Sequence, residues 1–188
     1  NPLCRKITFT GSPEAGRVLI RGAAATVKPL SLELGGHAPV LVFADADLGA
    51  AVEGAMMAKF RNTGQSCIAA NRVLVERPIY ERFLEAFVAK ARGLKVGDGL
   101  EAGVDIGPLF DEAGVAKALE HVDNAVAGGA RLLCGGRRAA GSRGFFVEPT
   151  VLADVPPTAA CMREETFAPI APVCAFDDEE EALEQANA

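Results

Sequence analysis

Short apolar runs alternate with longer helical patterns along the chain, and this alternation restricts the fold more than any other feature. The runs 5–10, 40–43 and 72–76 have the length and residue types of strands. Stretches of helical length, such as 79–92 and 111–127, separate predicted strands and carry apolar residues on one face. Strands that alternate with helices predict an α/β fold with a largely parallel sheet.

Two polar residues mark where helices should begin. Ser12 precedes Pro13 at a first helical position, and Asp47 precedes a helix that extends to about Phe60. The polar stretch 61–66, which contains one glycine, then predicts a loop.

Composition and charge exclude several classes of protein. With 49% hydrophobic and 23% charged residues among 188, the chain is globular in composition and long enough to bury a core. The acidic excess, 25 Asp and Glu against 19 Lys and Arg, and the lack of a dense basic stretch argue against nucleic-acid binding. Gly, Pro or charged residues interrupt each apolar run before the ~18 residues that a membrane span needs. We therefore expect neither nucleic acid nor a membrane as a partner.

The cysteines and histidines give no sign of a metal site. No pair among the five cysteines has Cys-x-x-Cys spacing, and both histidines, His37 and His121, are distant from the cysteines in sequence. We expect no metal, reduced thiols and a cytoplasmic location. His121 lies in a polar helical stretch and is expected to be exposed.

The segment that ends at Ser12 closes a predicted strand and opens a predicted helix. Gly11 lets a ligand approach the backbone, and the free N–H groups of a helix start suit a phosphate. Taken alone, however, the segment is better explained as an ordinary strand-to-helix turn that Ser12 caps.

Glu33 stands between two leucines and is followed by two glycines. Strict alternation places it on the opposite face of the strand from Leu32 and Leu34. Glu33 is then either a solvated side chain or a carboxylate beside space that the Gly35–Gly36 pair opens.

Cys67 follows the polar loop and precedes small apolar residues that are compatible with a helix. We expect it at the start of that helix, where the helix dipole favours thiolate over thiol. Taken alone, the local sequence favours the alternative, a buried and unreactive cysteine.

Four motifs occur in a distinctive order along the chain. They are Phe9-Thr10-Gly11-Ser12, Leu32-Glu33-Leu34-Gly35-Gly36, Gly64-Gln65-Ser66-Cys67 and Glu164-Glu165-Thr166-Phe167-Ala168-Pro169. In this order they resemble the aldehyde dehydrogenase superfamily, and the 34 positions from Glu33 to Cys67 match its spacing of general base and nucleophile. The resemblance covers essentially the whole chain.

The resemblance implies two partial domains. Residues 1–34 are expected to be the C-terminal end of a Rossmann-like cofactor-binding domain, and residues 35–188 an incomplete catalytic domain with a parallel sheet. The chain opens without Met and ends within a helical pattern, so we expect it to be a piece of a larger protein, which the resemblance implies to be a homo-oligomer.

The implied reaction is the oxidation of an aldehyde to a carboxylic acid through a cysteine thioester. Cys67 would attack the aldehyde carbon, and Glu33 would activate the water that hydrolyses the thioester. The resemblance does not distinguish NAD from NADP as the cofactor.

The resemblance also implies a set of cofactor contacts. Gly11 and Ser12 would contact the pyrophosphate, and Leu34 would contact the nicotinamide end through its backbone. Glu165 would bind the nicotinamide ribose, and Phe167 would lie beside the ring. Ala168 replaces the family's usual glycine, and the added methyl group affects the placement of Glu165 and Phe167.

Within the family, three stretches are most similar to the succinate-semialdehyde dehydrogenases: 59–65, 105–109 and 146–150. In that subfamily an arginine at the position of Arg61 is associated with the substrate carboxylate, and a guanidinium fork suits that group. A solvated or ion-paired Arg61 is the alternative.

Two further functions stay open. The chain can belong to a general short-chain aldehyde dehydrogenase, whose thiol can also support ester hydrolysis. It can also be an inactive piece that serves only as a structural module. Reduction of cofactor in proportion to aldehyde distinguishes a dehydrogenase from an enzyme that only hydrolyses esters or transfers acyl groups through Cys67 and Glu33.

Overall fold

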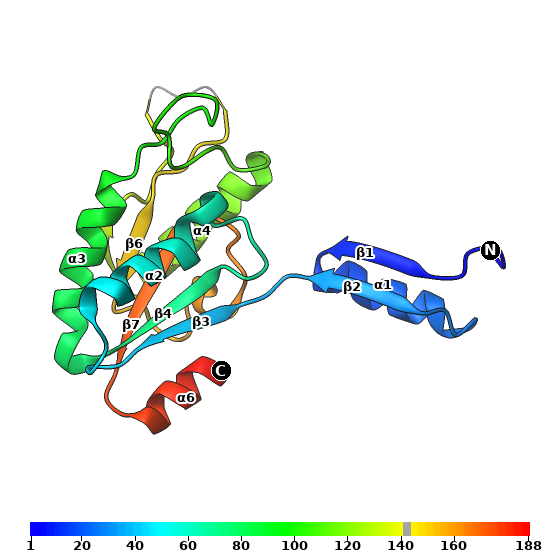
Figure 1. The fold of residues 1–188 in the computed structure, drawn as a ribbon, viewed down its shortest axis with the longest axis horizontal. Helices are drawn as coiled ribbons and strands as arrows, with labels where there is room; N and C mark the ends of the chain where they lie inside the picture. Colours follow the sequence, from blue (N-terminus) through cyan, green and yellow to red (C-terminus); the bar gives the residue numbers. More distant parts are fainter. Residues whose placement is uncertain (141–143) are drawn as a thin grey trace. The chain divides into compact units, whose positions relative to one another are not determined.

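The computed structural model describes residues 1–140 and 144–188 (Figure 1). The chain divides into two units, Asn1–Gly36 and His37–Ala188. Among the described residues, no helix is both long enough and apolar enough to cross a membrane.

The first unit is a strand–helix–strand element. Strand β1 (Ile7–Gly11) pairs in parallel with β2 (Leu30–Leu34), and helix α1 (Pro13–Ala24) connects them. Ser12 caps α1, as its sequence context predicts, because its hydroxyl accepts a hydrogen bond from the Ala15 N–H at 3.3 Å.

The second unit is built on a five-stranded sheet in the order β3-β4-β7-β6-β5. The strands are β3 (Ala38–Val42), β4 (Ala70–Glu76), β5 (Arg131–Cys134), β6 (Thr150–Ala153) and β7 (Ile170–Phe176). Three pairings are parallel, and only that between β5 and β6 is antiparallel. The predicted α/β fold with a largely parallel sheet is therefore confirmed.

Helices cover both faces of this sheet. They are α2 (Leu48–Phe60), α3 (Tyr80–Gly93), α4 (Glu112–Ala127), α5 (Ala160–Arg163) and α6 (Glu179–Asn187). One core packs α2 and α3 against one face, and a second packs α4, α5 and α6 against the other. Alternate residues of β4 divide between them, with Val73 and Val75 in the first core and Leu74 in the second, as the strand's two-residue period requires.

The connection from α2 to β4 carries Arg61 and Cys67, two of the four predicted site residues in this unit. A 3₁₀ turn, Arg61–Gly64, follows α2, and its residues Asn62, Thr63 and Gly64 all have positive φ angles. Non-glycine residues rarely adopt this region, so surrounding contacts must hold it.

The side chains of Thr63, within this turn, and of Gln65, directly after it, hold the turn against the loop that precedes α4. The Gln65 amide donates to the Pro108 carbonyl at 3.1 Å and accepts from the Phe110 N–H at 2.9 Å. The Thr63 hydroxyl accepts from the Gly107 N–H at 3.1 Å. These hydrogen bonds fix the strained turn in one conformation.

Gly64 is where this turn meets the segment before β7. Its φ is +72°, and a Cβ there would lie 2.4 Å from the Ala168 carbonyl oxygen and 3.2 Å from the Lys59 carbonyl oxygen. Both atoms are backbone and cannot move aside alone. Only glycine therefore permits this conformation and this approach together.

We predict that Gly64→Ala lowers the free energy of unfolding by about 2 kcal/mol or more, because the added methyl meets backbone atoms at a strained φ. The matched control is Gly54→Ala within α2, where a Cβ meets no atom within 4 Å. Removing glycine from a helix interior should stabilise by about 0.4–1 kcal/mol. Chemical denaturation of both variants measures this, and equal effects would contradict the close approach at Gly64.

Candidate functional site

In the first unit, the sequence-predicted site residues gather at the carboxyl ends of β1 and β2. Gly11 is the register partner of Leu34, and Thr10 is the partner of Glu33. Ser12 follows directly as the cap of α1, and Glu33 is exposed. Gly11, Ser12 and Leu34 therefore lie at the carboxyl edge of a parallel strand pair, the edge at which ligands of open α/β sheets bind.

The start of α1 already attracts a negative charge. The backbone N–H of Glu14, followed by the Ser12 side chain, lowers the pKa of the exposed Glu14 carboxyl. Gly16 lies close enough to β2 that a Cβ there would be 2.9 Å from the Leu34 methyl groups. The close strand–helix junction and the anion-attracting N–H groups are a donor set that fits a pyrophosphate.

In the second unit, Cys67 is exposed and lies in a turn, so the expectation that it begins a helix is wrong. The Ala69 N–H donates to the Ser66 carbonyl at 3.0 Å, and β4 begins at Ala70. The residues between Ser66 and β4 are fewer than the 3.6 of one helical turn. No helix begins at Cys67, and the exposure of its side chain excludes the alternative of a buried cysteine.

Residues on both sides of Cys67 line a pocket of about 780 Å³. Ser66 and Ile68 belong to it, and Arg61 supplies a cationic side chain from the preceding turn. Met57 and Ala58 of α2 contribute apolar wall, and the exposed fraction of Met57 is 68%. A pocket that is partly apolar with one guanidinium suits a short aliphatic ligand that carries an anionic group.

The segment 164–168 contains the other two predicted cofactor residues. Glu165 is half-buried, whereas Phe167 is 42% exposed and has a φ of 54°. Lys117 of α4 donates from Nζ to the Glu165 backbone carbonyl at 2.7 Å. Ala168 of this segment therefore contacts the turn that precedes Cys67, and the Glu165 carbonyl contacts α4.

His121 is buried, with 3% of its surface exposed, so the prediction that it is exposed is wrong. Its Nδ1 lies 3.0 Å from the Thr166 hydroxyl and its Nε2 lies 3.8 Å from Glu164. Desolvation lowers the pKa of His121, and the charge of Lys117 acts in the same direction. The sequence around His121 is polar on average, but the helix face that carries His121 is turned toward the segment 164–168.

Lys59 is a buried cation that the sequence analysis missed. It has no exposed surface, and its Nζ donates to the Asn71 side-chain oxygen at 3.4 Å. Burial lowers the pKa of the Lys59 ammonium to about 7, while Cys161 and Glu165 act in the opposite direction. The available signal was a lysine directly before Phe60 in a helix that is otherwise almost entirely apolar.

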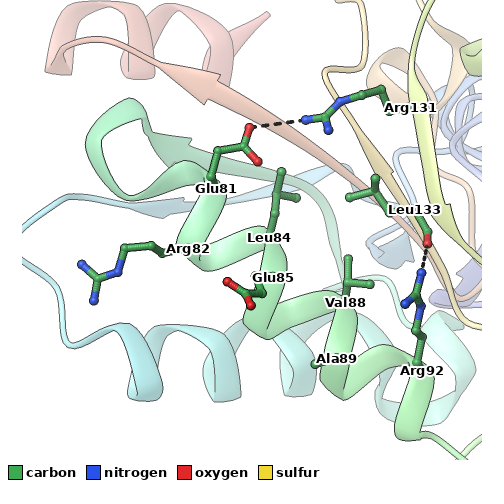
Figure 2. Close-up of a pocket in the computed structure, with 9 residues that line it drawn as sticks. All are labelled: Glu81, Arg82, Leu84, Glu85, Val88, Ala89, Arg92, Arg131 and Leu133. Carbon is green, nitrogen blue, oxygen red and sulfur yellow. Dashed lines mark hydrogen bonds and ion pairs between the residues drawn. The ribbon is translucent and has the colours of Figure 1, made fainter.

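A second pocket, of about 530 Å³, lies between α3 and β5 (Figure 2). Glu81 pairs with Arg131 at 3.4 Å, and Arg92 donates to the Leu133 carbonyl at 2.7 Å (Figure 2). None of the sequence-predicted site residues lines this pocket. Across residues 1–140 and 144–188, no three His, Cys, Asp or Glu residues gather where they could hold a metal ion.

The structure thus forms two groups of site residues, one in each unit. Gly11, Ser12, Glu33 and Leu34 share a sheet edge in the first unit. In the second, the turn before Cys67 contacts the segment that carries Glu165 and Phe167. Glu33 and Cys67 belong to different units, so their pairing stays a prediction from the sequence.

Comparisons with known proteins identify the family of the chain. A family model described as "Aldehyde dehydrogenase family" matches residues 1–188. The chain is 53% identical over 188 residues to a 3-sulfolactaldehyde dehydrogenase of Pseudomonas putida. The aligned region covers 100% of this chain and 38% of that protein. It is 52% identical over 187 residues to an NADP(+) succinate-semialdehyde dehydrogenase of Escherichia coli, which it covers to 39%.

A solved structure gives the same result for the fold. The crystal structure of an Escherichia coli NADP-dependent enzyme superimposes on this chain with a TM-score of 0.97 at 51% sequence identity. The superposition covers 100% of this chain and 39% of the chain of that enzyme. The chain therefore spans somewhat more than a third of the length of these relatives. With the family match extending over every residue, the chain belongs to the aldehyde dehydrogenase family.

Proposed function

We propose that this chain is part of an enzyme that oxidises an aldehyde to a carboxylic acid with NAD or NADP. In this proposal residues 1–34 are the end of the cofactor-binding domain and residues 35–188 are part of the catalytic domain, a boundary two residues before the division between the units Asn1–Gly36 and His37–Ala188. The observation that carries it is the contact at Gly64, which joins the turn leading to the exposed Cys67 to the segment of Glu165 and Phe167. Nucleophile and cofactor contacts are then held by one backbone junction.

Cys67 is the proposed nucleophile. Its Sγ forms a bond to the aldehyde carbon and gives a thiohemiacetal, whose oxyanion the Cys67 backbone N–H stabilises. Exposure in a turn beside a pocket gives the sulfur access to a substrate, which the buried Cys161 and Cys174 lack. Burial raises the pKa of Cys161 to about 11 and of Cys174 to about 12, so neither competes as a thiolate.

The remaining steps need a base and a hydride acceptor. A nicotinamide held at this site would supply the hydride acceptor that is needed for the thiohemiacetal to become a thioester on Cys67. Glu33 then removes a proton from water as the water attacks the thioester, and the acid and the free thiol leave. An exposed carboxylate at a strand end can reach water, as this role requires.

Gly11, Ser12 and Leu34 are the proposed contacts at the sheet edge, and Glu165 and Phe167 the proposed contacts at the nicotinamide end. The N–H groups of α1 would bind the pyrophosphate, as their effect on Glu14 supports. A carboxylate at Glu165 can accept hydrogen bonds from ribose hydroxyls. The exposed ring of Phe167 offers a flat apolar surface beside the nicotinamide.

We propose succinate semialdehyde as the substrate, with Arg61 binding its carboxylate. The pocket beside Cys67 combines this one guanidinium with apolar wall. The two relatives' names specify aldehydes with an anionic group, a sulfonate in one and a carboxylate in the other, and a guanidinium fork can bind either. A general short-chain aldehyde dehydrogenase is the alternative.

The first test concerns the proposed nucleophile in the full-length protein that carries this chain. Cys67→Ala should lower aldehyde oxidation about a thousandfold or more while the dissociation constant of the cofactor stays nearly unchanged. Cys4→Ala, which removes another exposed thiol, should leave the rate unchanged. Steady-state rates and calorimetry measure both properties. Substantial turnover by the Cys67 variant would exclude the covalent route.

For Glu33→Gln we expect a burst of reduced cofactor followed by slow turnover, because hydride transfer precedes the step that needs the base. A rapid-mixing absorbance measurement resolves the two phases. If burst and steady state disappear together, Glu33 does not act in thioester hydrolysis alone.

The substrate proposal is tested at Arg61. Arg61→Ala should raise KM for succinate semialdehyde about 10- to 150-fold, the loss of one charge-assisted contact. KM for an uncharged aldehyde of similar length should change little. Initial rates on the two aldehydes give the comparison, and equal losses on both would favour the general dehydrogenase.

A further inference from the structure

The buried His121 belongs to a pair of side chains one turn apart on α4. Lys117 and His121 are separated by four positions, so they point from the same face of the helix. Lys117 donates to the Glu165 carbonyl at 2.7 Å, and His121 contacts the Thr166 hydroxyl at 3.0 Å. This helix face therefore holds two consecutive residues of the segment 164–168.

The proton positions in this contact follow from its surroundings. Nε2 of His121 faces the Glu164 carboxylate at 3.8 Å, which favours the proton on Nε2. Nδ1 is then an acceptor, and the Thr166 hydroxyl, itself only 2% exposed, donates to it. With both Thr166 and His121 buried, a lost bond would leave a polar atom without water to replace its partner.

The held segment has a backbone that needs such support. Phe167 has a φ of 54°, a region that a bulky residue rarely adopts without external contacts. Thr166 lies directly between Glu165 and Phe167. A fixed position of Thr166 therefore fixes the directions in which the side chains of Glu165 and Phe167 project from the backbone.

We propose that Lys117 and His121 are positioning residues for the nicotinamide end of the cofactor, acting through the backbone of Glu165 and the hydroxyl of Thr166. Neither side chain contacts the cofactor in this account. The inference rests on the proposed function, because it assigns the geometry of the Glu165 and Phe167 contacts to α4. The junction at Gly64 fixes the end of the segment at Ala168, and this pair fixes its middle.

The test uses the full-length protein and measures binding of NAD and of NADP by calorimetry. His121→Leu should raise the dissociation constant of the bound cofactor about 3- to 10-fold, the loss of one hydrogen bond. Lys117→Met should do the same. His121→Asn should restore most of the affinity, because its amide oxygen can accept from Thr166 at the position of Nδ1. KM for the aldehyde should be unchanged in all three.

Two controls lie on the same helix. Val122→Ala removes a buried core side chain next to His121 and should lower the unfolding temperature while the cofactor dissociation constant stays at the wild-type value. Asp123→Asn, at an exposed position, should change neither quantity.

The outcomes separate this inference from the proposed function. Wild-type affinity in both His121→Leu and Lys117→Met contradicts the inference alone, as does an equal loss of affinity in Val122→Ala. A wild-type protein that binds neither NAD nor NADP and oxidises no aldehyde contradicts the proposed function, and the inference with it. Should His121→Leu fail to fold, Lys117→Met and His121→Asn still decide the matter.

Discussion

The close approach of Gly64 to the backbone of Ala168 is the contact on which the second unit's site depends. It brings a turn that follows α2 and a segment that precedes β7 to one place, although 104 positions separate them in sequence. The hydrogen bonds of Thr63 and Gln65 hold one side of this contact, and α4 holds the other. The site therefore depends on a backbone conformation and a close approach that require glycine at position 64.

The first unit shows how a parallel strand pair concentrates functional groups. Because β1 and β2 run in the same direction, their carboxyl ends lie together and place Gly11 beside Leu34 and Thr10 beside Glu33. Ser12 follows at the start of α1, where the N–H groups attract negative charge. The candidate cofactor contacts Gly11 and Leu34 and the candidate base Glu33 thus lie at the same edge of the strand pair, and no contact between helices is needed to bring them together.

Much of the fold could be predicted from local chemistry, and the failures have a common cause. The helix starts at Ser12 and Asp47 were readable because a capping side chain bonds a backbone N–H three residues on. The burial of His121 was not, because it depends on Thr166, a partner distant in sequence. The turn at Cys67 was not either, because it is set by the start of β4 at Ala70, and β4 is held in place by its pairing with β3 and β7. Lys59 was missed for the same reason: its partner Asn71 lies on a neighbouring strand.

The central claim is that Cys67 carries the acyl group, and mass spectrometry of the full-length Glu33→Gln protein tests it most directly. The protein is mixed with aldehyde and cofactor, quenched during the burst and digested. The account predicts an acyl adduct in stoichiometric amount on the peptide that contains Cys67 and none on the peptide that contains Cys4. Reduced cofactor without an adduct on Cys67, or an adduct on another residue, would contradict it.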